Sequence, residues 1–405
     1  MTPYDCVIVG GGLVGASLAC ALRHTPLRLA LIEAVPFDAD QQPSYDDRGL
    51  ALSAASRRIL SGIGAWESIA PHATPIHAIH ISERGRFGAT RLRAQDFGMP
   101  ALAHVVMART LGRVLTQALK DDPHLDIHCP AVVTDVRVQG EALEVTARRG
   151  ERTLQLSSRL LIVADGSQSR TRGILDVPVR GRDYHQTAIV ANVTPSRPHQ
   201  HVAYERFTPD GPVAVLPHAE GRCGLVYVVP TQESDVALTC TEAEFLVQVR
   251  KRFGRRLGDF TALGRRSHYP LRLSVAERIA GSRFVIIGNA AHAIHPNAAQ
   301  GFNLGLRDVA VLAELLHAAA RANEDVGSQV LTQAYAARCR TDQRRTIGFS
   351  DGLARLFYSD RLPLVLVRNA GMLAVDIVPP LKRALLRAGS GLRGPVPRLV
   401  QGLPL

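Results

Sequence analysis

Residues 4–33 read YDCVIVGGGLVGASLACALRHTPLRLALIE, and this stretch decides the fold. The run YDCVIV at 4–9 is apolar and rich in β-branched residues, and it stops at three glycines. An alanine- and leucine-rich helical pattern follows, and a second apolar run covers residues 27–32. Strand, glycine turn, helix and strand in this order predict a Rossmann-like βαβ unit.

Gly10, Gly12 and Gly15 form the pattern G-x-G-x-x-G within this unit. The first glycine permits the tight turn, the second lets the backbone approach a pyrophosphate, and the third lets helix and strand pack closely. Glu33 ends the second strand, where a carboxylate can accept hydrogen bonds from a ribose. The same pattern recurs at 389–394 as GSGLRG, but no predicted strand precedes it, and we interpret that match as a chance turn.

The composition excludes several classes of protein. The chain has 405 residues, of which 46% are hydrophobic and 21% charged, so we expect two or three folded domains and no disordered or fibrous chain. Its formal net charge is +12, but only three of the basic residues are lysines. We attribute this arginine bias to genome composition rather than to nucleic-acid binding.

The six cysteines lack metal-ligand spacing, which predicts buried thiols and no metal site. We also expect no signal peptide and no membrane span.

We expect an α/β fold in three parts. A Rossmann-like dinucleotide-binding domain takes residues 1–75, 98–178 and 281–330, and within it a helical pattern covers 50–59. An inserted antiparallel β-sheet domain for the substrate takes 76–97 and 179–280, where short β-rich runs alternate with Gly, Pro and Asp turns. A helical C-terminal region takes 331–405.

Two further predicted strands end in polar turns. One turn is ADGSQSRTR at 164–172, and the other is GNAAH at 288–292, with the loop PNAAQGFN at 296–303. Ligands of open α/β sheets gather at the carboxyl ends of the strands, so the three turns can converge on one cofactor. The 296–303 loop should also open a helix that runs to Ala320, whose N-terminus would stabilise an anionic ring.

These three turns resemble the fingerprints of the flavin-dependent aromatic hydroxylases of the p-hydroxybenzoate hydroxylase superfamily. The resemblance extends from residue 4 to about 320. Within the superfamily the chain is most similar to the ubiquinone-biosynthesis hydroxylases. The strings that carry this similarity are DDRGLALS (46–53), AIVANV (188–193), YERFTPDGPVAVLP (204–217), HYPL (268–271) and GFNLGLRD (301–308).

The resemblance implies an FAD-dependent monooxygenase with NAD(P)H as co-substrate. In this family NAD(P)H reduces FAD, O₂ forms a C4a-hydroperoxide on the flavin, and its distal oxygen attacks an electron-rich phenol. The implied substrate is a polyprenylated phenol, 2-polyprenyl-6-methoxyphenol, which is converted to the 1,4-benzoquinol. The alternatives are a sister hydroxylase of the pathway that acts at another carbon, a hydroxylase of soluble phenols, and a non-catalytic component of a biosynthetic assembly.

The resemblance also assigns residues to the cofactor. The glycine turn would hold the pyrophosphate, Glu33 the ribose, and the backbone at 299–304 the pyrimidine edge of the flavin. The implied FAD-binding residues are Gly10, Gly12, Gly15, Glu33, Arg48, Arg109, Asp165, Gly166, Gly288, Asn289, Pro296, Gln300, Gly301 and Asn303.

Two positions depart from the superfamily pattern. Asn289 stands where Asp is usual, but Asn can still hydrogen-bond the ribityl chain, and the ubiquinone-pathway branch is itself similar in carrying G-N. Ala299 replaces the first glycine of G-Q-G, so we expect either an ordinary negative φ at this residue or a slightly strained loop beside the flavin.

Three side chains are candidates for proton transfer with the phenol. His292 and His295 fall in the flavin loop, and a histidine near neutral pKa suits phenol deprotonation. The alternative, which we favour, is that both hydrogen-bond the backbone of a tight loop. Tyr269 can line the substrate cavity or be a buried strand tyrosine with a satisfied hydroxyl.

The C-terminal segment suggests how a lipid substrate is reached. From Ile377 onward there are five basic residues and no acids. We predict that residues 377–405 dock on an anionic membrane surface or an acidic partner protein, and the alternative is a solvated basic tail. We therefore expect a cytoplasmic protein, with a peripheral position at the inner face of the membrane as one option. Contacts with other ubiquinone-biosynthesis proteins and self-association stay open.

Overall fold

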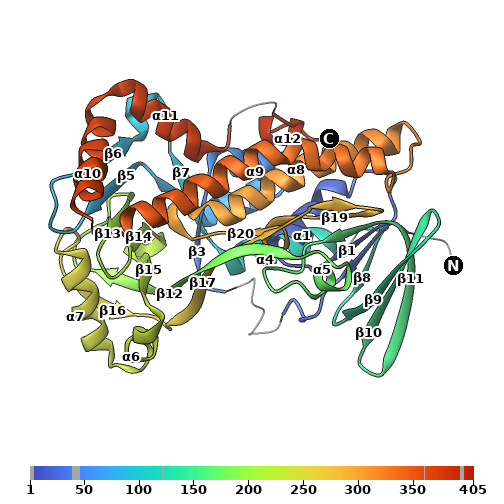
Figure 1. Cartoon of the computed structure of the whole chain (residues 1–405), viewed down its shortest axis with the longest axis horizontal. Coiled ribbons are helices and arrows are strands. Elements are labelled where there is room, and N and C mark those ends of the chain that lie inside the picture. The colour runs from blue at the N-terminus through green and yellow to red at the C-terminus, as the bar shows by residue number, and fades with distance from the viewer. Residues whose placement is uncertain (1–3, 39–45, 121, 360, 393–395) are drawn as a thin grey trace.

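The computed structural model describes residues 4–38, 46–120, 122–359, 361–392 and 396–405. Two large sheets lie at opposite ends of the molecule, and two long helices run along both of them (Figure 1). The long helices are α8 (Gln300–Arg321) and α9 (Gln329–Phe357).

The first sheet is the predicted Rossmann-like sheet. Its five central strands are parallel, as expected for strands that are buried on both faces. A β-hairpin extends antiparallel from one of them. In order across the sheet the strands are β18 (Ala280–Gly281), β19 (Phe284–Ile286), β11 (Arg152–Val163), β1 (Tyr4–Val9), β2 (Leu29–Ile32) and β8 (Leu125–His128), with β9 (Val132–Gln139) and β10 (Ala142–Arg149) as the hairpin.

Helices cover this sheet through a continuous apolar core. The alanine-rich helix that follows the glycine turn packs between α8 and the helix at Ala108–Leu119. Small residues on that alanine-rich helix allow the close approach. The helices are α1 (Leu13–Leu22), α2 (Ala54–Gly62), α3 (Trp66–Ile69), α4 (Ala108–Leu119) and α5 (Arg170–Ile174).

The expected helix over 50–59 is wrong at its start. Residues Gly49–Leu52 form a strand, β3, and α2 begins only after Ser53. The Ser53 hydroxyl accepts a hydrogen bond from the N–H of Ser56 at 3.3 Å, so this serine is a helix N-cap and ends the strand. β3 belongs to a small antiparallel sheet with β4 (Thr74–Ile76) and β7 (Ala103–Met107).

The second large sheet is built mainly from residues 179–276, and the segment around 78–93 joins its edge. It is antiparallel except for β13 and β5, which pair in parallel. Two helices, α6 (Ser234–Thr239) and α7 (Glu242–Phe253), close its outer face over an apolar cluster. The strand order is β20 (His292–Ala293), β17 (Ser267–Ala276), β12 (Val179–Pro195), β15 (Cys223–Pro230), β14 (Val213–Pro217), β13 (Val202–Phe207), β5 (Ala78–Glu83) and β6 (Ala89–Arg93), with β16 (Phe260–Leu263) on β12.

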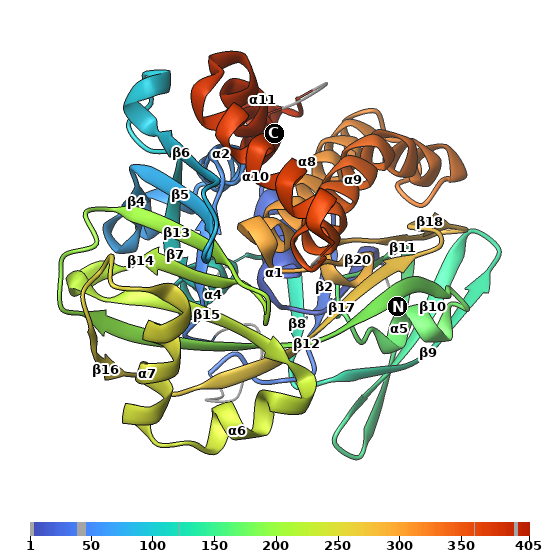
Figure 2. The ribbon, with the colours of Figure 1, turned by 60° about the vertical axis from the view of Figure 1, so that its left-hand side comes forward.

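The C-terminal region folds back over the molecule. Helices α10 (Leu362–Ile377) and α11 (Pro379–Ser390) lie beside β5 and β6 (Figure 2). The last helix, α12 (Arg398–Gln401), lies next to α2 and α8, where Leu399 and Val400 are buried in the main core. The end of the predicted basic tail is therefore part of the folded domain.

All six cysteines are free thiols. Among the described residues no single helix is long and apolar enough to cross a membrane; α10 and α11 together meet that criterion, but the chain bends by 99° between them.

Candidate functional site

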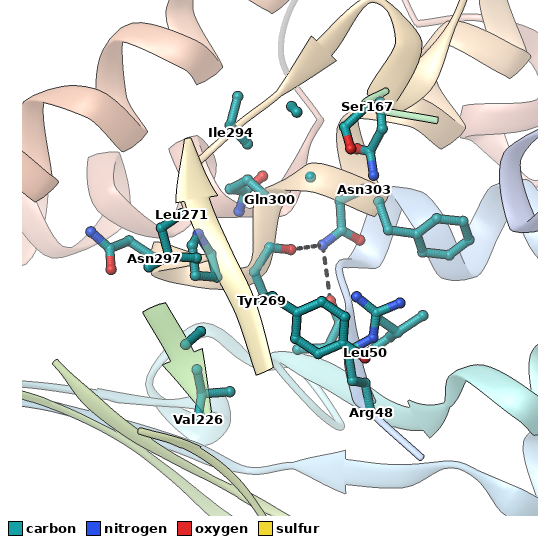
Figure 3. A pocket seen from close by; sticks show the side chains of 18 of the residues that line it. Arg48, Leu50, Ser167, Val226, Tyr269, Leu271, Ile294, Asn297, Gln300 and Asn303 are labelled. Carbon is teal, nitrogen blue, oxygen red and sulfur yellow. Dashed lines mark hydrogen bonds between the residues drawn. The ribbon is translucent and has the colours of Figure 1, made fainter. Parts of the chain in front are cut away.

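A cavity of about 2330 Å³ lies among the two large sheets and helices α8 to α11. All three polar turns singled out in the sequence open into it, at residues 10–14, 164–172 and 289–303. The inner face of the second sheet forms the opposite wall, mostly with apolar side chains. Figure 3 shows the part of the cavity where the 297–303 loop faces Tyr269, Leu271 and Val226 of that sheet.

The glycine turn requires glycine for steric reasons at two positions. Gly10 has φ +102°, and a Cβ on it would lie 2.5 Å from the carbonyl oxygen of Ala164. A Cβ on Gly15 would lie 1.9 Å from the carbonyl oxygen of Gly10. Gly10 and Gly12 line the cavity, whereas Gly15 allows α1 to pack on β1. No side chain caps the N-terminus of α1, and Gly12, Leu13 and Val14 line the cavity, so this helix start suits an anion.

Glu33 is buried at the end of β2 and lines the cavity next to this turn. Its carboxylate accepts hydrogen bonds from the N–H groups of Gly11, at 2.5 Å, and Val35, at 2.8 Å. The two bonds hold the carboxylate at the edge of the glycine turn, where a ribose diol can reach it.

The second turn carries an incompletely bonded carboxylate. Oδ2 of Asp165 accepts a hydrogen bond from the N–H of Thr171 at 3.1 Å, while the buried Oδ1 has no partner among the described residues. Arg172 links this turn to the third, because its guanidinium donates to the carbonyl oxygens of Ala290, at 2.7 Å, and Ser167, at 3.3 Å. The Asp165 oxygen is thus available for a donor from a ligand.

The third turn starts α8 with a left-handed residue. Ala299 has φ +49°, so the expectation of a negative φ is wrong and the strained alternative is correct. Asn303 stabilises this start, since its Nδ2 donates to the carbonyl oxygens of Ala299, at 2.6 Å, and Ala51, at 2.9 Å (Figure 3). Its Oδ1 accepts from the Ser53 N–H at 2.8 Å. The N-terminus of α8 has no side-chain cap and opens into the cavity.

Tyr269, a candidate for proton transfer, lines the cavity but uses its hydroxyl within the protein. The hydroxyl donates to Oδ2 of Asp46 at 2.5 Å, and Arg48 lies 4.5 Å from the ring centre while also pairing with Asp46. Burial is the main reason that the pKa of Tyr269 rises to about 12. This arrangement fits a tyrosine that positions Arg48 at the cavity wall.

His292 and His295, the other two candidates, lie outside the cavity wall. Nε2 of His292 donates to Oδ2 of Asp308 at 2.6 Å. Nδ1 of His295 accepts from the N–H of Asn297 at 3.3 Å, and burial lowers the pKa of His295 to about 4. Both contacts favour a structural role, although the partner of His292 is a carboxylate and not the backbone.

Most of the expected cofactor residues meet at the cavity, and three of them do not. Gly15 and Gly288 serve packing, since Gly288, with φ +60°, lies against Val14 of α1. Arg109 is half-exposed and pairs with Asp47 at 2.8 Å. The expected residues that line the cavity are Gly10, Gly12, Glu33, Arg48, Asp165, Gly166, Asn289, Pro296, Gln300, Gly301 and Asn303.

The chemistry of these groups fits FAD. Two helix N-termini without side-chain caps open into one cavity, which suits a pyrophosphate at α1 and an electron-rich ring at α8. Glu33 and the unpartnered oxygen of Asp165 can accept hydrogen bonds from sugar and ribityl hydroxyls. The cavity also exceeds the usual size of about 300 to 1,000 Å³ for a single ligand, so a second molecule can bind beside the cofactor.

Comparison with known proteins decides the family. A family model described as an FAD binding domain matches residues 3–350. The chain is 36% identical over 407 residues to ubiquinone hydroxylase UbiL of Rhodospirillum rubrum, covering 99% of this chain and 93% of the relative. It is 30% identical over 395 residues to 3-demethoxyubiquinol 3-hydroxylase of Escherichia coli, covering 96% and 99%. The chain belongs to the FAD-dependent hydroxylases.

Solved structures share the fold of this hydroxylase at low sequence identity. p-Nitrophenol 4-monooxygenase PnpA from Pseudomonas putida DLL-E4 has a TM-score of 0.79 at 17% identity, covering 97% of this chain and 99% of that one. PqsL of P. aeruginosa, in complex with 2-aminobenzoylacetate, has a TM-score of 0.77 at 20% identity, covering 91% and 100%.

Sequence reasoning about the hydroxylase missed two carboxyl groups, of which Asp308 is buried and Glu205 is partly buried. Asp308 on α8 accepts hydrogen bonds from Gly288 and His292 of the third turn and from Gln343 of α9. Glu205 on β13 faces the cavity. Glu205 could have been found from strand alternation, because it shares its face of the strand with the apolar Ala203 and Phe207. For Asp308 the sequence offers only an acidic residue in a strongly apolar helix.

Proposed function

We propose that this hydroxylase oxidises the ring of a polyprenylated phenol in ubiquinone biosynthesis, with 2-polyprenyl-6-methoxyphenol as substrate and NAD(P)H and O₂ as co-substrates. The observation that carries the proposal is the apolar wall of the cavity opposite the three cofactor turns. The ubiquinone hydroxylases among its relatives support the substrate class.

Bound FAD supplies the redox chemistry and the activation of O₂. The residues of this chain bind and orient. The N-terminus of α1 and Glu33 would hold the dinucleotide end of FAD, and the N-terminus of α8 would face its ring end. The apolar wall keeps water out and orients the phenol ring. Val190, Val226 and Leu271 of the second sheet belong to that wall.

The cavity also extends toward the C-terminal helices, where an apolar prenyl chain can lie. Met372 and Val375 of α10 and Leu385 and Leu386 of α11 line this part. Val367 lines the cavity as well, yet its side chain is 65% exposed, so the cavity reaches the outer face of α10. A long apolar chain can therefore remain partly outside the protein while its ring binds inside.

The test is hydroxylation by the purified holoenzyme of a prenylated 2-methoxyphenol with a short prenyl chain, followed by mass spectrometry of the product. We expect NAD(P)H oxidation stimulated by the phenol and one oxygen atom added to the ring. Oxygen at another ring carbon would support the sister hydroxylase of the pathway. A preference for phenols without a prenyl chain would support the soluble-phenol alternative. Absence of any turnover would support the non-catalytic component.

We further propose that α10 and α11 contact an anionic membrane surface. The hydroxylase would then be a cytoplasmic protein with a peripheral position at the inner face of the membrane. Several apolar side chains of this pair are exposed, and two arginines of α11, Arg383 and Arg387, are exposed beside them. Apolar burial combined with basic charge is the usual basis of interfacial helix binding. The exposed apolar side chains are Leu362, Leu364, Leu366, Val367, Leu373, Ile377, Val378 and Leu381.

Point substitutions test this contact better than truncation, because removing residues 377–405 would also remove Leu399 and Val400 from the core. We expect Leu366→Ser with Val367→Ser to reduce flotation with phosphatidylglycerol-containing vesicles. Arg383→Glu with Arg387→Glu should reduce it further. Val330→Ser on α9, whose side chain is 80% exposed, is the matched control. Flotation of both double variants at the level of the control would refute the contact.

A further inference from the structure

Glu205 lies on the cavity wall of the second sheet in an otherwise apolar row. The row crosses five strands in register, from β5 through β13, β14 and β15 to β12, and all its members line the cavity. Val226, in the same row, faces the 297–303 loop. Glu205 lies two strands away from Val226, at about 10 Å by the usual strand spacing. The members of the row are Ile81, Glu205, Ala214, Val226 and Val190.

The Glu205 carboxyl differs from the other acidic side chains that line the cavity. Glu33 and Asp165 accept backbone hydrogen bonds at the cofactor turns, and Asp183 pairs with Arg272 at 3.0 Å. None of the described residues donates a hydrogen bond to the Glu205 side chain or pairs with it. The side chain of Glu205 is partly buried and faces the cavity. A carboxyl that is partly removed from water and lacks a partner costs free energy, so its presence in an apolar wall points to a ligand.

Among the residues that the structure describes, no free countercharge faces Glu205. On its own strand, Tyr204 packs on Phe253 across the sheet, and Arg206 lies on that outer side near Gly254. On β5, His80 packs against Tyr204, and Glu83 pairs with Arg368 of α10. β14 carries no titratable side chain. Burial alone raises the pKa of Glu205 to about 7.

We propose that Glu205 accepts the hydroxyl proton of the phenol substrate during ring hydroxylation. The inference rests on the proposed function. The O–H bond of the phenol breaks and an O–H bond forms on the Glu205 carboxylate, so the negative charge passes from the carboxylate to the phenol oxygen without a change in electron count. That oxygen then donates electron density into the ring, which favours attack by the ring on an electrophilic oxygen.

Glu205 suits this role better than the three side chains that the sequence suggested. The hydroxyl of Tyr269 already donates to Asp46, and His292 and His295 lie behind the cavity wall. A base works best when its pKa lies near the working pH, and a carboxyl that titrates near neutrality meets that condition. The base and the apolar wall that orients the ring then belong to one sheet.

The test compares wild type with Glu205→Gln, which keeps the shape and a hydrogen-bond acceptor but cannot take the proton, and Glu205→Leu, which removes both. Binding to the oxidised holoenzyme is followed by the change in flavin absorbance. The probes are a short-chain prenylated 2-methoxyphenol and its methyl ether. Glu220→Gln, an exposed carboxylate of the same sheet region, is the control.

Wild type should bind the phenol about tenfold or more tightly than the ether at pH 8, as for one hydrogen bond to a charged acceptor. Glu205→Leu should lose that preference. Glu205→Gln should keep part of it, but its hydroxylation rate should fall about 100-fold or more, and the rise in rate through about pH 7 should disappear.

Two results would overturn the assignment: an unchanged preference for the phenol in Glu205→Leu, or a wild-type rate and pH profile in Glu205→Gln. These are distinct from failure of the proposed function, in which wild type itself would not hydroxylate the prenylated phenol. If Glu205→Leu does not fold, the Glu205→Gln pH profile alone decides.

Discussion

Nε2 of His292 donates a hydrogen bond to Oδ2 of Asp308 at 2.6 Å, and both side chains are almost fully buried. The same carboxylate accepts from the N–H of Gly288, at 3.1 Å, and from Nε2 of Gln343, at 2.8 Å. Asp308 thus joins the third cofactor turn to α8 and α9. Its role is to hold the loop whose far side forms the cavity.

We expect Asp308→Ala to destabilise the protein by about 3–5 kcal/mol, because it leaves several buried donors without an acceptor. Urea unfolding followed by circular dichroism measures this loss. Glu277→Ala, which breaks an exposed pair with Arg180, should change the free energy of unfolding far less, because solvent screens that pair. Equal effects of the two substitutions would show that the Asp308 network adds no stability.

Gly15→Ala should abolish FAD binding or weaken it severely. The new methyl group would lie 1.9 Å from the carbonyl oxygen of Gly10, so α1 must move away from the turn that would hold the pyrophosphate. Gly348→Ala, inside α9 with no atom within 4 Å of the added Cβ, is the matched control and should stabilise by up to about 1 kcal/mol. The flavin content of the purified variants is the measurement, and full FAD occupancy in Gly15→Ala would contradict the packing argument.

Ala299→Gly should stabilise the protein by about 1 kcal/mol, because Ala299 adopts φ +49°, where glycine has no Cβ penalty. The same substitution at Ala318, an exposed position inside α8, should instead cost about 1 kcal/mol. Thermal or urea unfolding of the two variants gives the comparison. A loss of stability in both variants would show that Ala299 is not strained.

Acidification should destabilise the fold, partly through His295. Burial lowers the pKa of His295 to about 4, against 6.5 for an ordinary histidine, so the unfolded chain binds a proton between these values that the folded chain does not. Stability is therefore present above about pH 6.5 and is lost as the pH falls toward 4. His80 and His104, with pKa also near 4, act in the same direction.

The slope of the unfolding free energy against pH reports how many more protons the unfolded chain binds than the folded one. His295→Gln should reduce this number by up to about one between pH 6.5 and 4. Urea titrations at several pH values measure this slope. His185→Gln, at an exposed turn, is the control for the substitution itself. A slope in His295→Gln equal to that of wild type would mean that His295 titrates normally in the folded protein.

The cofactor half of the site was largely predictable from the sequence. Gly10, Glu33, Asp165 and Asn303 each belong to a turn that follows a buried strand, and the carboxyl ends of parallel strands share one edge of the sheet. Their convergence on one cavity needed only the rule for parallel sheets. The need for glycine at Gly10 and Gly15 was likewise predictable, because it follows from the geometry of one short turn motif.

The proton-transfer candidates could not be ranked in this way. His292 and Tyr269 have the right chemical type and lie near the right motifs. However, Asp308 binds Nε2 of His292 and Asp46 binds the hydroxyl of Tyr269, and these partners lie 16 and 223 residues away along the chain. Glu205 lies within the family string at 204–217, but strand alternation alone does not tell what its face of the strand packs against. Only the pairing of β13 with β5 and β14 puts its carboxyl in the cavity wall.

The sequence by itself determined the Rossmann-like unit, the three cofactor turns and the FAD-dependent class, because these depend on short-range sterics and hydrogen bonding within a turn. The tertiary structure decided which carboxyl lies in the apolar wall of the cavity, which histidines are buried behind that wall, and that Leu399 and Val400 at the end of the basic segment belong to the core. Each of these depends on contacts between distant segments of the chain. Local residue patterns do not determine which distant side chain will pack against a given residue or form a hydrogen bond with it.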